Sequence, residues 1–197
     1  MKYKNIIFDF GNVIGTFKAN SILKQFCSSQ EDFDTLASVL FREWPALDAG
    51  TIDYDEYAEA SILLLPEHLR KTGRAFFSDW FAHVEPIPAM WDFVRELKAQ
   101  NVSIYLLSNA PTKFAERAPQ DHEILKEFDG IVFSAPIKMA KPAPEIYRYL
   151  FDTFHLAPSE CFFIDDTEAN ILAGRELGMD GIVFTGDVEA VKKAVGF

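Results

Sequence analysis

The chain of 197 residues is 49% hydrophobic and 25% charged, which is typical of a folded domain and argues against a disordered chain. Thirty acidic residues against 19 basic ones give a formal net charge of −11, so we expect neither nucleic acid nor an anionic membrane as a partner. The two separated cysteines and four scattered histidines have no spacing typical of a disulfide framework or a zinc site.

Short apolar runs alternate with longer helical patterns over most of the chain. The runs are hydrophobic on both sides, which is typical of strands covered on both faces of a parallel sheet. The alternation predicts an α/β protein with a three-layer, doubly wound, Rossmann-like parallel sheet. Strands are predicted at 5–8, 103–107, 130–133, 161–164 and 181–184, and helices at about 87–100, 144–154 and 168–177, the last capped by Gly178.

Residues 17 to 83 have a different pattern, with several helical stretches and no convincing strand. Trp44-Pro45, Asp48-Ala49-Gly50 and Leu65-Pro66 are predicted breaks between these helices. The prolines at 86 and 88 mark a return to the α/β pattern. We therefore expect a discontinuous α/β core at 1–16 and 84–197, interrupted by a small helical cap domain at 17–83.

Polar residues follow several of the predicted strands. Such positions meet at one edge of an open parallel sheet, where ligands bind. Each of them alone is also compatible with a turn, a helix cap or a surface side chain. Together they offer a carboxylate, an anion-binding hydroxyl, a fixed cation and an acidic metal site, a set suited to phosphoryl transfer. They are Asp9, Ser108-Asn109, Lys141 and Asp165-Asp166.

The ordered set resembles the haloacid dehalogenase-like superfamily, in the group with a helical cap inserted after the first motif. Four segments carry the resemblance. The form FD-x-GNV in the first of them is similar to a bacterial subgroup that includes sugar-phosphate phosphatases, among them a glucose-1-phosphatase. The segments are IFDFGNV at 7–13, LLSN at 106–109, KPAPEIY at 141–147 and FIDDTEAN at 163–170.

The resemblance implies a role for each matched residue. Asp9 would attack phosphorus, form an aspartyl-phosphate and bind Mg²⁺ together with Asp166 and the backbone carbonyl of Gly11. Asp165 would reach the metal through water or support the ligands. Ser108, with the backbone at Asn109, would hold a phosphoryl oxygen, and Lys141 would neutralise charge.

Gly11 departs from the family pattern, which usually has aspartate two residues after the nucleophile. Glycine keeps the carbonyl but lacks the side chain that protonates the leaving group, a function worth ~10²–10⁴-fold in rate. Glycine there is also compatible with a simple need for positive φ. The substrate would then have a leaving group that needs little protonation, or a water molecule or a cap residue would replace the missing acid. Glu43, Asp48 and Glu56 lie in the insertion, and the sequence does not select among them.

The sequence therefore predicts a Mg²⁺-dependent phosphatase acting on a small phosphorylated metabolite, a sugar phosphate by the resemblance. The alternative is that the chain has lost turnover and is a noncatalytic phosphate-binding regulatory protein. A 2-haloacid dehalogenase is a weaker alternative because those relatives use no metal and lack the paired acids. The cap would select the substrate, with Trp44 in contact or packed in the core of the cap. With no signal-peptide or membrane-spanning pattern, we expect a cytoplasmic protein.

Overall fold

The computed structural model describes residues 1–197 and contains one five-stranded parallel sheet with the strand order β3-β2-β1-β4-β5. The central strand β1 pairs with β2 on one side and β4 on the other. This sheet confirms the predicted fold class, although the last strand begins one residue earlier than predicted. The strands are β1 (Asn5–Phe8), β2 (Ser103–Ser108), β3 (Gly130–Phe133), β4 (Cys161–Asp165) and β5 (Asp180–Val183).

Helices cover both faces of the sheet. Successive side chains of a strand point to opposite sides, so the apolar strands present hydrophobic residues on both faces. On one face, Ile6 and Phe8 pack with residues of α6 (Pro88–Ala99) and α11 (Val188–Val195). On the other, Ile7 packs with residues of α9 (Pro144–Phe154) and α10 (Glu168–Glu176). Gly178 has a φ of +89° just after α10, as its predicted capping role requires.

Three helices of this part were not predicted from the sequence: α7 (Thr112–Asp121), α8 (Ser134–Ile137) and α11. The helix α7 contains Pro119, which has no amide hydrogen for a helical bond and so weakens a helical pattern. The helix α8 has only four residues, too few for any periodicity. Two further short 3₁₀ helices are η3 (Glu123–Glu127) and η4 (Pro158–Glu160).

The segment between β1 and α6 contains helices only. Trp44-Pro45, predicted as a break, instead forms the first turn of α3, where proline is tolerated. Its helices are α1 (Ala19–Leu23), α2 (Gln30–Leu40), α3 (Trp44–Asp48), α4 (Tyr54–Leu64), η1 (Glu67–Leu69), α5 (Arg70–Asp79) and η2 (Trp80–His83). No helix of the structure is both long and apolar enough to cross a membrane.

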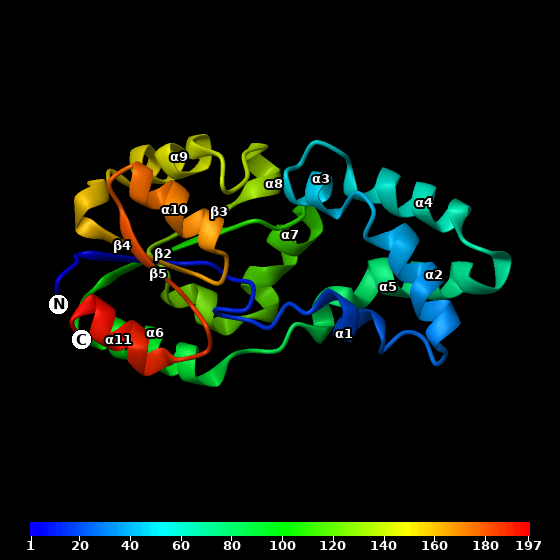
Figure 1. Cartoon of the computed structure of the whole chain (residues 1–197), viewed down its shortest axis with the longest axis horizontal. Helices are drawn as coiled ribbons and strands as arrows, with labels where there is room; N and C mark the ends of the chain where they lie inside the picture. Colours follow the sequence, from blue (N-terminus) through cyan, green and yellow to red (C-terminus); the bar gives the residue numbers. More distant parts are fainter.

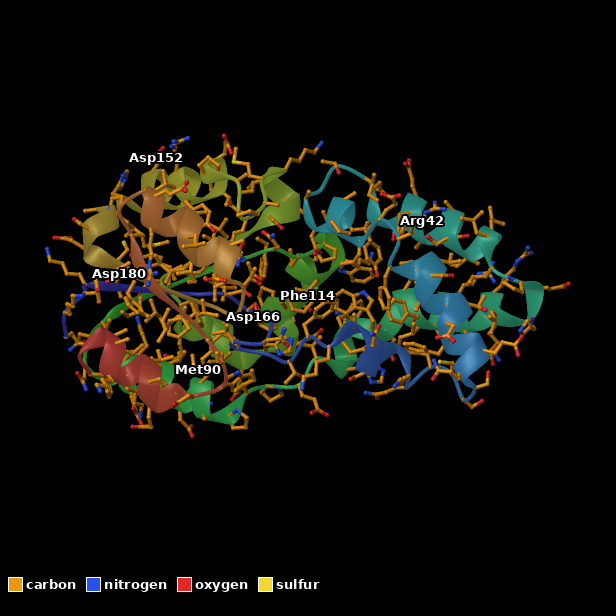
Figure 2. The ribbon with its side chains drawn as sticks, in the orientation of Figure 1. Arg42, Met90, Phe114, Asp152, Asp166 and Asp180 are labelled. Carbon is orange, nitrogen blue, oxygen red and sulfur yellow. The ribbon has the colours of Figure 1, made fainter.

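These helices lie at one end of the molecule and the sheet with its own helices at the other, with α3 beside α8 where the two meet (Figure 1). Two adjacent chain segments connect the ends: the amide of Thr16 donates to the carbonyl of Glu85 at 2.7 Å, and that of Ile87 to Ile14 at 3.0 Å. Asp166 and Phe114 lie close to this junction (Figure 2).

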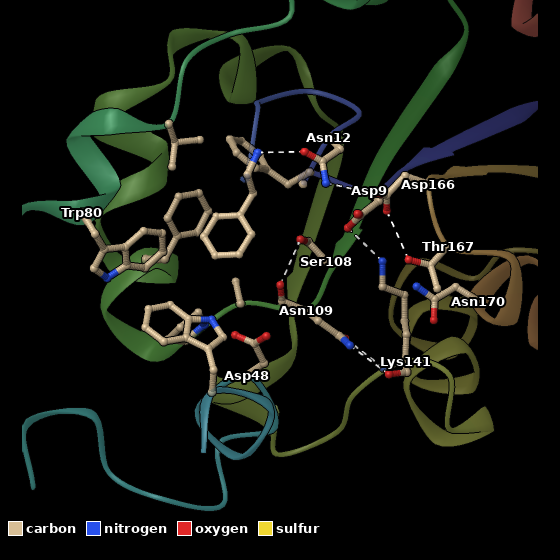
Figure 3. A pocket seen from close by; sticks show the side chains of 18 residues that line it. Asp9, Asn12, Asp48, Trp80, Ser108, Asn109, Lys141, Asp166, Thr167 and Asn170 are labelled. Atoms are coloured by element: carbon tan, nitrogen blue, oxygen red, sulfur yellow. Dashed lines mark hydrogen bonds and ion pairs between the residues drawn. The ribbon is translucent and has the colours of Figure 1, made fainter. Parts of the chain in front are cut away.

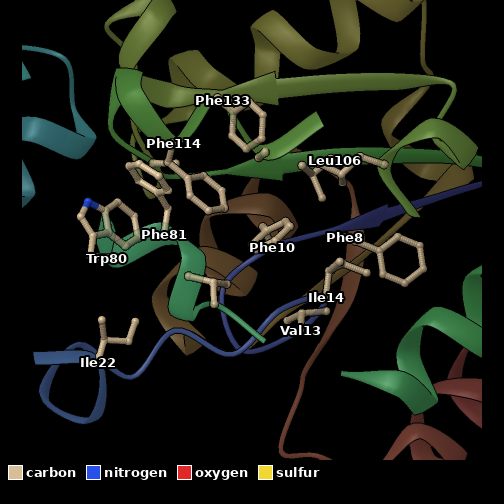
Figure 4. Packing of buried hydrophobic residues seen from close by; sticks show 14 of the residues in the cluster. Phe8, Phe10, Val13, Ile14, Ile22, Trp80, Phe81, Leu106, Phe114 and Phe133 are labelled. Atoms are coloured by element: carbon tan, nitrogen blue, oxygen red, sulfur yellow. The ribbon is translucent and has the colours of Figure 1, made fainter. Parts of the chain in front are cut away.

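Aromatic side chains join the two ends of the molecule through one continuous hydrophobic cluster. The ring of Phe114 lies 5.0 Å from that of Phe10, which follows β1, and 5.6 Å from that of Trp80 in η2. Figure 4 shows these rings between the sheet and the inserted helices, with Phe81 and Phe133 beside them. Burying such large rings is worth several kcal/mol, so this cluster holds the helical segment against the ends of the strands.

Candidate active site

Most of the residues predicted from the strand ends line one pocket of about 260 Å³ (Figure 3), whereas Asp165 is fully buried and does not line it. Asp9 comes directly after β1 and Ser108 ends β2, while Asp166 directly follows β4. Lys141 enters from the loop before α9. The carboxyl ends of neighbouring parallel strands lie at one edge, which explains why residues so distant in sequence share this pocket.

Lys141 forms the electrostatic centre of the site. Its Nζ lies 2.8 Å from Oδ1 of Asp9 and 2.6 Å from Oδ2 of Asp165, and its side chain is 1% exposed. Burial alone would lower the pKa of Lys141, but the two carboxylates outweigh it and raise the pKa above its ordinary value. Lys141 is therefore a permanent cation at the base of the pocket.

Asp165 has little capacity left for a metal ion. Its Oδ1 accepts from the backbone amide of Thr167 at 2.8 Å, and Asn170 Nδ2 lies 3.0 Å from each carboxylate oxygen. Lys141 takes a further position on Oδ2. A carboxylate accepts about four hydrogen bonds, so Asp165 is saturated by the protein. It positions Lys141 and Asn170.

Asp9 and Asp166 are better placed to bind a cation. One oxygen from each of Asp9, Asp165 and Asp166 lies within 4.8 Å of the other two, and Lys141 pairs with only the first two of these carboxylates. Asn12, at a φ of +56°, donates from Nδ2 to Oδ2 of Asp166 at 2.9 Å and fixes that carboxylate. A site made of oxygen donors with excess negative charge fits Mg²⁺.

Burial raises the pKa of the Asp9 carboxyl, with Lys141 acting against this and Asp165 adding to it. The carboxylate needs nearby positive charge to stay ionised in this setting. Lys141 engages Oδ1, so Oδ2 is the oxygen that can face a bound molecule in the pocket.

Ser108 and Asn109 contribute in different ways. The Ser108 hydroxyl makes one marginal contact within the protein, at 3.5 Å to the carbonyl of Asn109, so it is available to a ligand. The Asn109 side chain is used by the protein: Nδ2 donates to the carbonyl of Lys141 at 2.8 Å, and Oδ1 accepts from the amide of Lys141 at the same distance. Asn109 thereby fixes the backbone that carries Lys141.

Gly11 lines the pocket but does not adopt positive φ; the adjacent Asn12 does. The interpretation that glycine is needed there for backbone freedom is therefore wrong. A Cβ added at Gly11 would find its nearest neighbours at 3.7 Å, on Asp9 Oδ2 and the Cβ of Phe17. The position has room for a side chain and lies beside the proposed nucleophile.

Trp44 also lines the pocket, yet it is only 8% exposed. Its ring stacks with Phe17 at 6.2 Å and meets Trp80 at 5.3 Å. With Phe114 these rings form an apolar wall of the pocket. Trp80 of this wall lies across the pocket from Asp9 and Lys141 (Figure 3). A ligand held here would meet charge on one side and aromatic faces on the other.

Sequence reasoning missed three residues of the site. Asn170 and Asn12 were quoted within motifs without a role of their own. Asp48 was one of three undistinguished acids of the insertion, whereas the structure places it in the pocket wall. For Asn170, the signal was its position in the first turn of α10, which directs it back to the strand end before it.

Comparison with known proteins agrees with this geometry. The family model for the haloacid dehalogenase-like hydrolases matches residues 3–178. A sesquiterpene phosphatase of Aspergillus oryzae is 29% identical over 93% of this chain and 90% of its own length. D-ribitol-5-phosphate phosphatase of Bacteroides thetaiotaomicron is 28% identical, covering 90% and 89% of the two chains. An enzyme of the family from Bacteroides thetaiotaomicron, crystallised with magnesium and inorganic phosphate, superimposes with a TM-score of 0.76 at 21% identity, covering 96% and 98%.

Proposed function

The chain belongs to the haloacid dehalogenase-like hydrolase family, and from this premise we propose that it is a Mg²⁺-dependent phosphatase for a small phosphorylated metabolite. The observation that carries the proposal is the ion-paired group of Asp9, Lys141 and Asp165 at the base of a pocket. The two phosphatases that it resembles over nearly their whole length support the same reaction class.

Asp9 is the proposed nucleophile. Lys141 holds Oδ1 and leaves Oδ2 for the attack on phosphorus, which would give an aspartyl-phosphate without breaking the ion pair. The hydroxyl of Ser108 and the ammonium of Lys141 would bind two phosphoryl oxygens from different sides. Fixed donors of this kind stabilise the charge that the phosphoryl group carries in the transition state.

Asp9, Asp166 and the carbonyl of Gly11 would hold Mg²⁺, with Asp165 behind them as the support for Lys141. When bound, the ion supplies positive charge to the phosphoryl oxygens and favours the ionised form of Asp9. Asn12 keeps Asp166 turned toward this position.

The helical segment 17–83 would act as the cap that selects the substrate. Its aromatic wall suits the apolar face of a sugar or polyol chain, or a wholly apolar group, attached to the phosphate. A sugar phosphate is the proposed substrate class, and Trp44 is its proposed contact in the cap. The apolar wall is the reason to test a prenyl phosphate beside it.

Phosphate release from a panel of sugar, polyol and prenyl phosphates, with Mg²⁺ or with EDTA, tests the function. We expect turnover with Mg²⁺ only and its loss in Asp9→Asn. Asp152→Asn, an exposed acid on α9, is the matched control and keeps full activity. Turnover in EDTA, or in Asp9→Asn, would overturn the proposal. Phosphate binding without any turnover would favour the noncatalytic alternative, which the glycine at position 11 motivates.

A further inference from the structure

Asp48 is the one acidic residue of the helical insertion that lines the pocket. Asp48 is the last residue of α3, and its side chain projects into the pocket. Asp9 and Lys141 lie on the other side of the pocket (Figure 3). The two other acids considered from the sequence, Glu43 and Glu56, are exposed and do not line the pocket. The structure therefore distinguishes among residues that the sequence could not.

The carboxyl group of Asp48 is unusual because Oδ1 is buried and has no hydrogen-bond partner in the protein. Buried polar atoms are almost always paired, so an unpartnered carboxyl oxygen in a residue that lines the pocket indicates a side chain that the protein itself does not use. Its backbone, in contrast, is firmly held: the buried hydroxyl of Ser134 donates to the Asp48 carbonyl. The main chain is fixed and the side chain is left available.

We infer that Asp48 is the general acid and base of the reaction, in place of the carboxylate missing at Gly11; this rests on the proposed phosphatase function. In phosphoryl transfer the attacking and leaving oxygens lie roughly in line on opposite sides of phosphorus. With Asp9 at the strand ends, the leaving oxygen points toward the insertion. Asp48 is the acid that the insertion presents there.

Asp48 would act in both steps of the reaction, the formation and the hydrolysis of the aspartyl-phosphate. Oδ2 of Asp9 bonds to phosphorus as the ester P–O bond breaks, and the leaving oxygen keeps the electron pair, takes the Asp48 proton and departs as an alcohol. Asp48, now a carboxylate, accepts a proton from the water that attacks the aspartyl-phosphate. The P–O bond to Asp9 then breaks, which releases inorganic phosphate and restores both carboxyl groups.

The protonation of Asp48 suits this role. Burial, reinforced by the negative charge of Asp9 and partly opposed by Lys141, raises the pKa of Asp48 to about 7. Asp166 is the remaining charged side chain in the pocket lining. A carboxyl group with a pKa near neutral can both donate and accept a proton during one turnover at that pH.

Leaving-group dependence in the isosteric variant Asp48→Asn tests the inference. An alkyl phosphate such as ribitol 5-phosphate needs a protonated leaving group, whereas p-nitrophenyl phosphate expels a stable anion. We expect kcat for the alkyl ester to fall ~10²–10⁴-fold in the variant, and far less for the aryl ester. The wild-type kcat/KM for the alkyl ester should also decrease above about pH 7, and this decrease should vanish in the variant.

Glu56→Gln, which neutralises an exposed acid of the same insertion, is the control and should leave both rates unchanged. Equal losses for both esters in Asp48→Asn, or no loss for either, would overturn the role of Asp48 and leave the phosphatase function standing. If the wild-type protein hydrolyses neither ester with Mg²⁺, the proposed function fails instead. The two failures are thus distinguishable.

Discussion

The hydroxyl of Ser134 donates a hydrogen bond to the backbone carbonyl of Asp48, across the junction between the sheet end and the helical insertion. The same oxygen accepts from the amide of Ala110 at 2.9 Å, two residues beyond the proposed phosphate-binding Ser108. One buried side chain therefore joins the loop that would hold the phosphoryl group to the helix that carries the proposed acid.

We expect Ser134→Ala to destabilise the protein by about 1–3 kcal/mol, because it leaves the Ala110 amide and the Asp48 carbonyl without this buried partner. Urea unfolding measures this loss, and Ser38→Ala at an exposed position is the control. If Ser134 also positions Asp48, alkyl phosphate hydrolysis should fall more than aryl phosphate hydrolysis in folded Ser134→Ala. Equal effects on the two esters would show a structural role only.

Gly50 allows α3 to approach α8 closely. It has a φ of +65°, and a Cβ there would lie 2.2 Å from the carbonyl oxygen of Ala135. We expect Gly50→Ala to push α3 off the sheet end and to lower turnover of alkyl phosphates. Gly186→Ala is a matched control, because Gly186 also has positive φ but nothing within 4 Å of its Cβ position. If both substitutions lowered turnover similarly, backbone strain at positive φ would explain the loss, and the close approach of α3 to α8 would not.

Asp48→Asn should make the protein more stable than the wild type at neutral and higher pH. The folded-state pKa of Asp48 is raised to about 7, so the native protein binds the proton more tightly than the unfolded chain does. Wild-type stability is therefore lost as the pH rises from the ordinary aspartate range to about 7. The free energies of unfolding should differ little near about pH 4 and most above about pH 7. A constant difference would contradict the raised pKa.

Lys141→Met should be strongly destabilising in EDTA, by about 3–5 kcal/mol, because two buried carboxylates would lose their shared cation. Lys71→Met, at an exposed position, should change the free energy of unfolding little. Urea denaturation of both variants measures the contrast. A mild effect at Lys141 would mean that the pocket admits water around Asp9 and Asp165.

The sequence was sufficient to predict the parts of the site that depend on the sheet. Asp9, Ser108 and Asp165 could be placed together because parallel strands bring their carboxyl ends to one edge. Asp48 could not be distinguished from Glu43, because its position depends on how α3 packs against α8. That packing is set by Ser134 and by the close approach at Gly50, and no periodicity in the insertion encodes either contact.

Gly11→Asp gives the sharpest test of how the acid is supplied. The position has room, since the nearest atoms to an added Cβ lie at 3.7 Å, and one of them is Oδ2 of Asp9. A carboxyl group there would start beside the nucleophile, where the family resemblance places the acid. In the Asp48→Asn background we expect Gly11→Asp to restore alkyl phosphate turnover, up to the ~10²–10⁴-fold that a general acid contributes. Gly11→Asn, with the same shape and no acidic proton, should restore nothing. Rescue by both variants would mean that position 11 acts through shape, and rescue by neither would mean that a side chain at position 11 cannot reach the leaving oxygen.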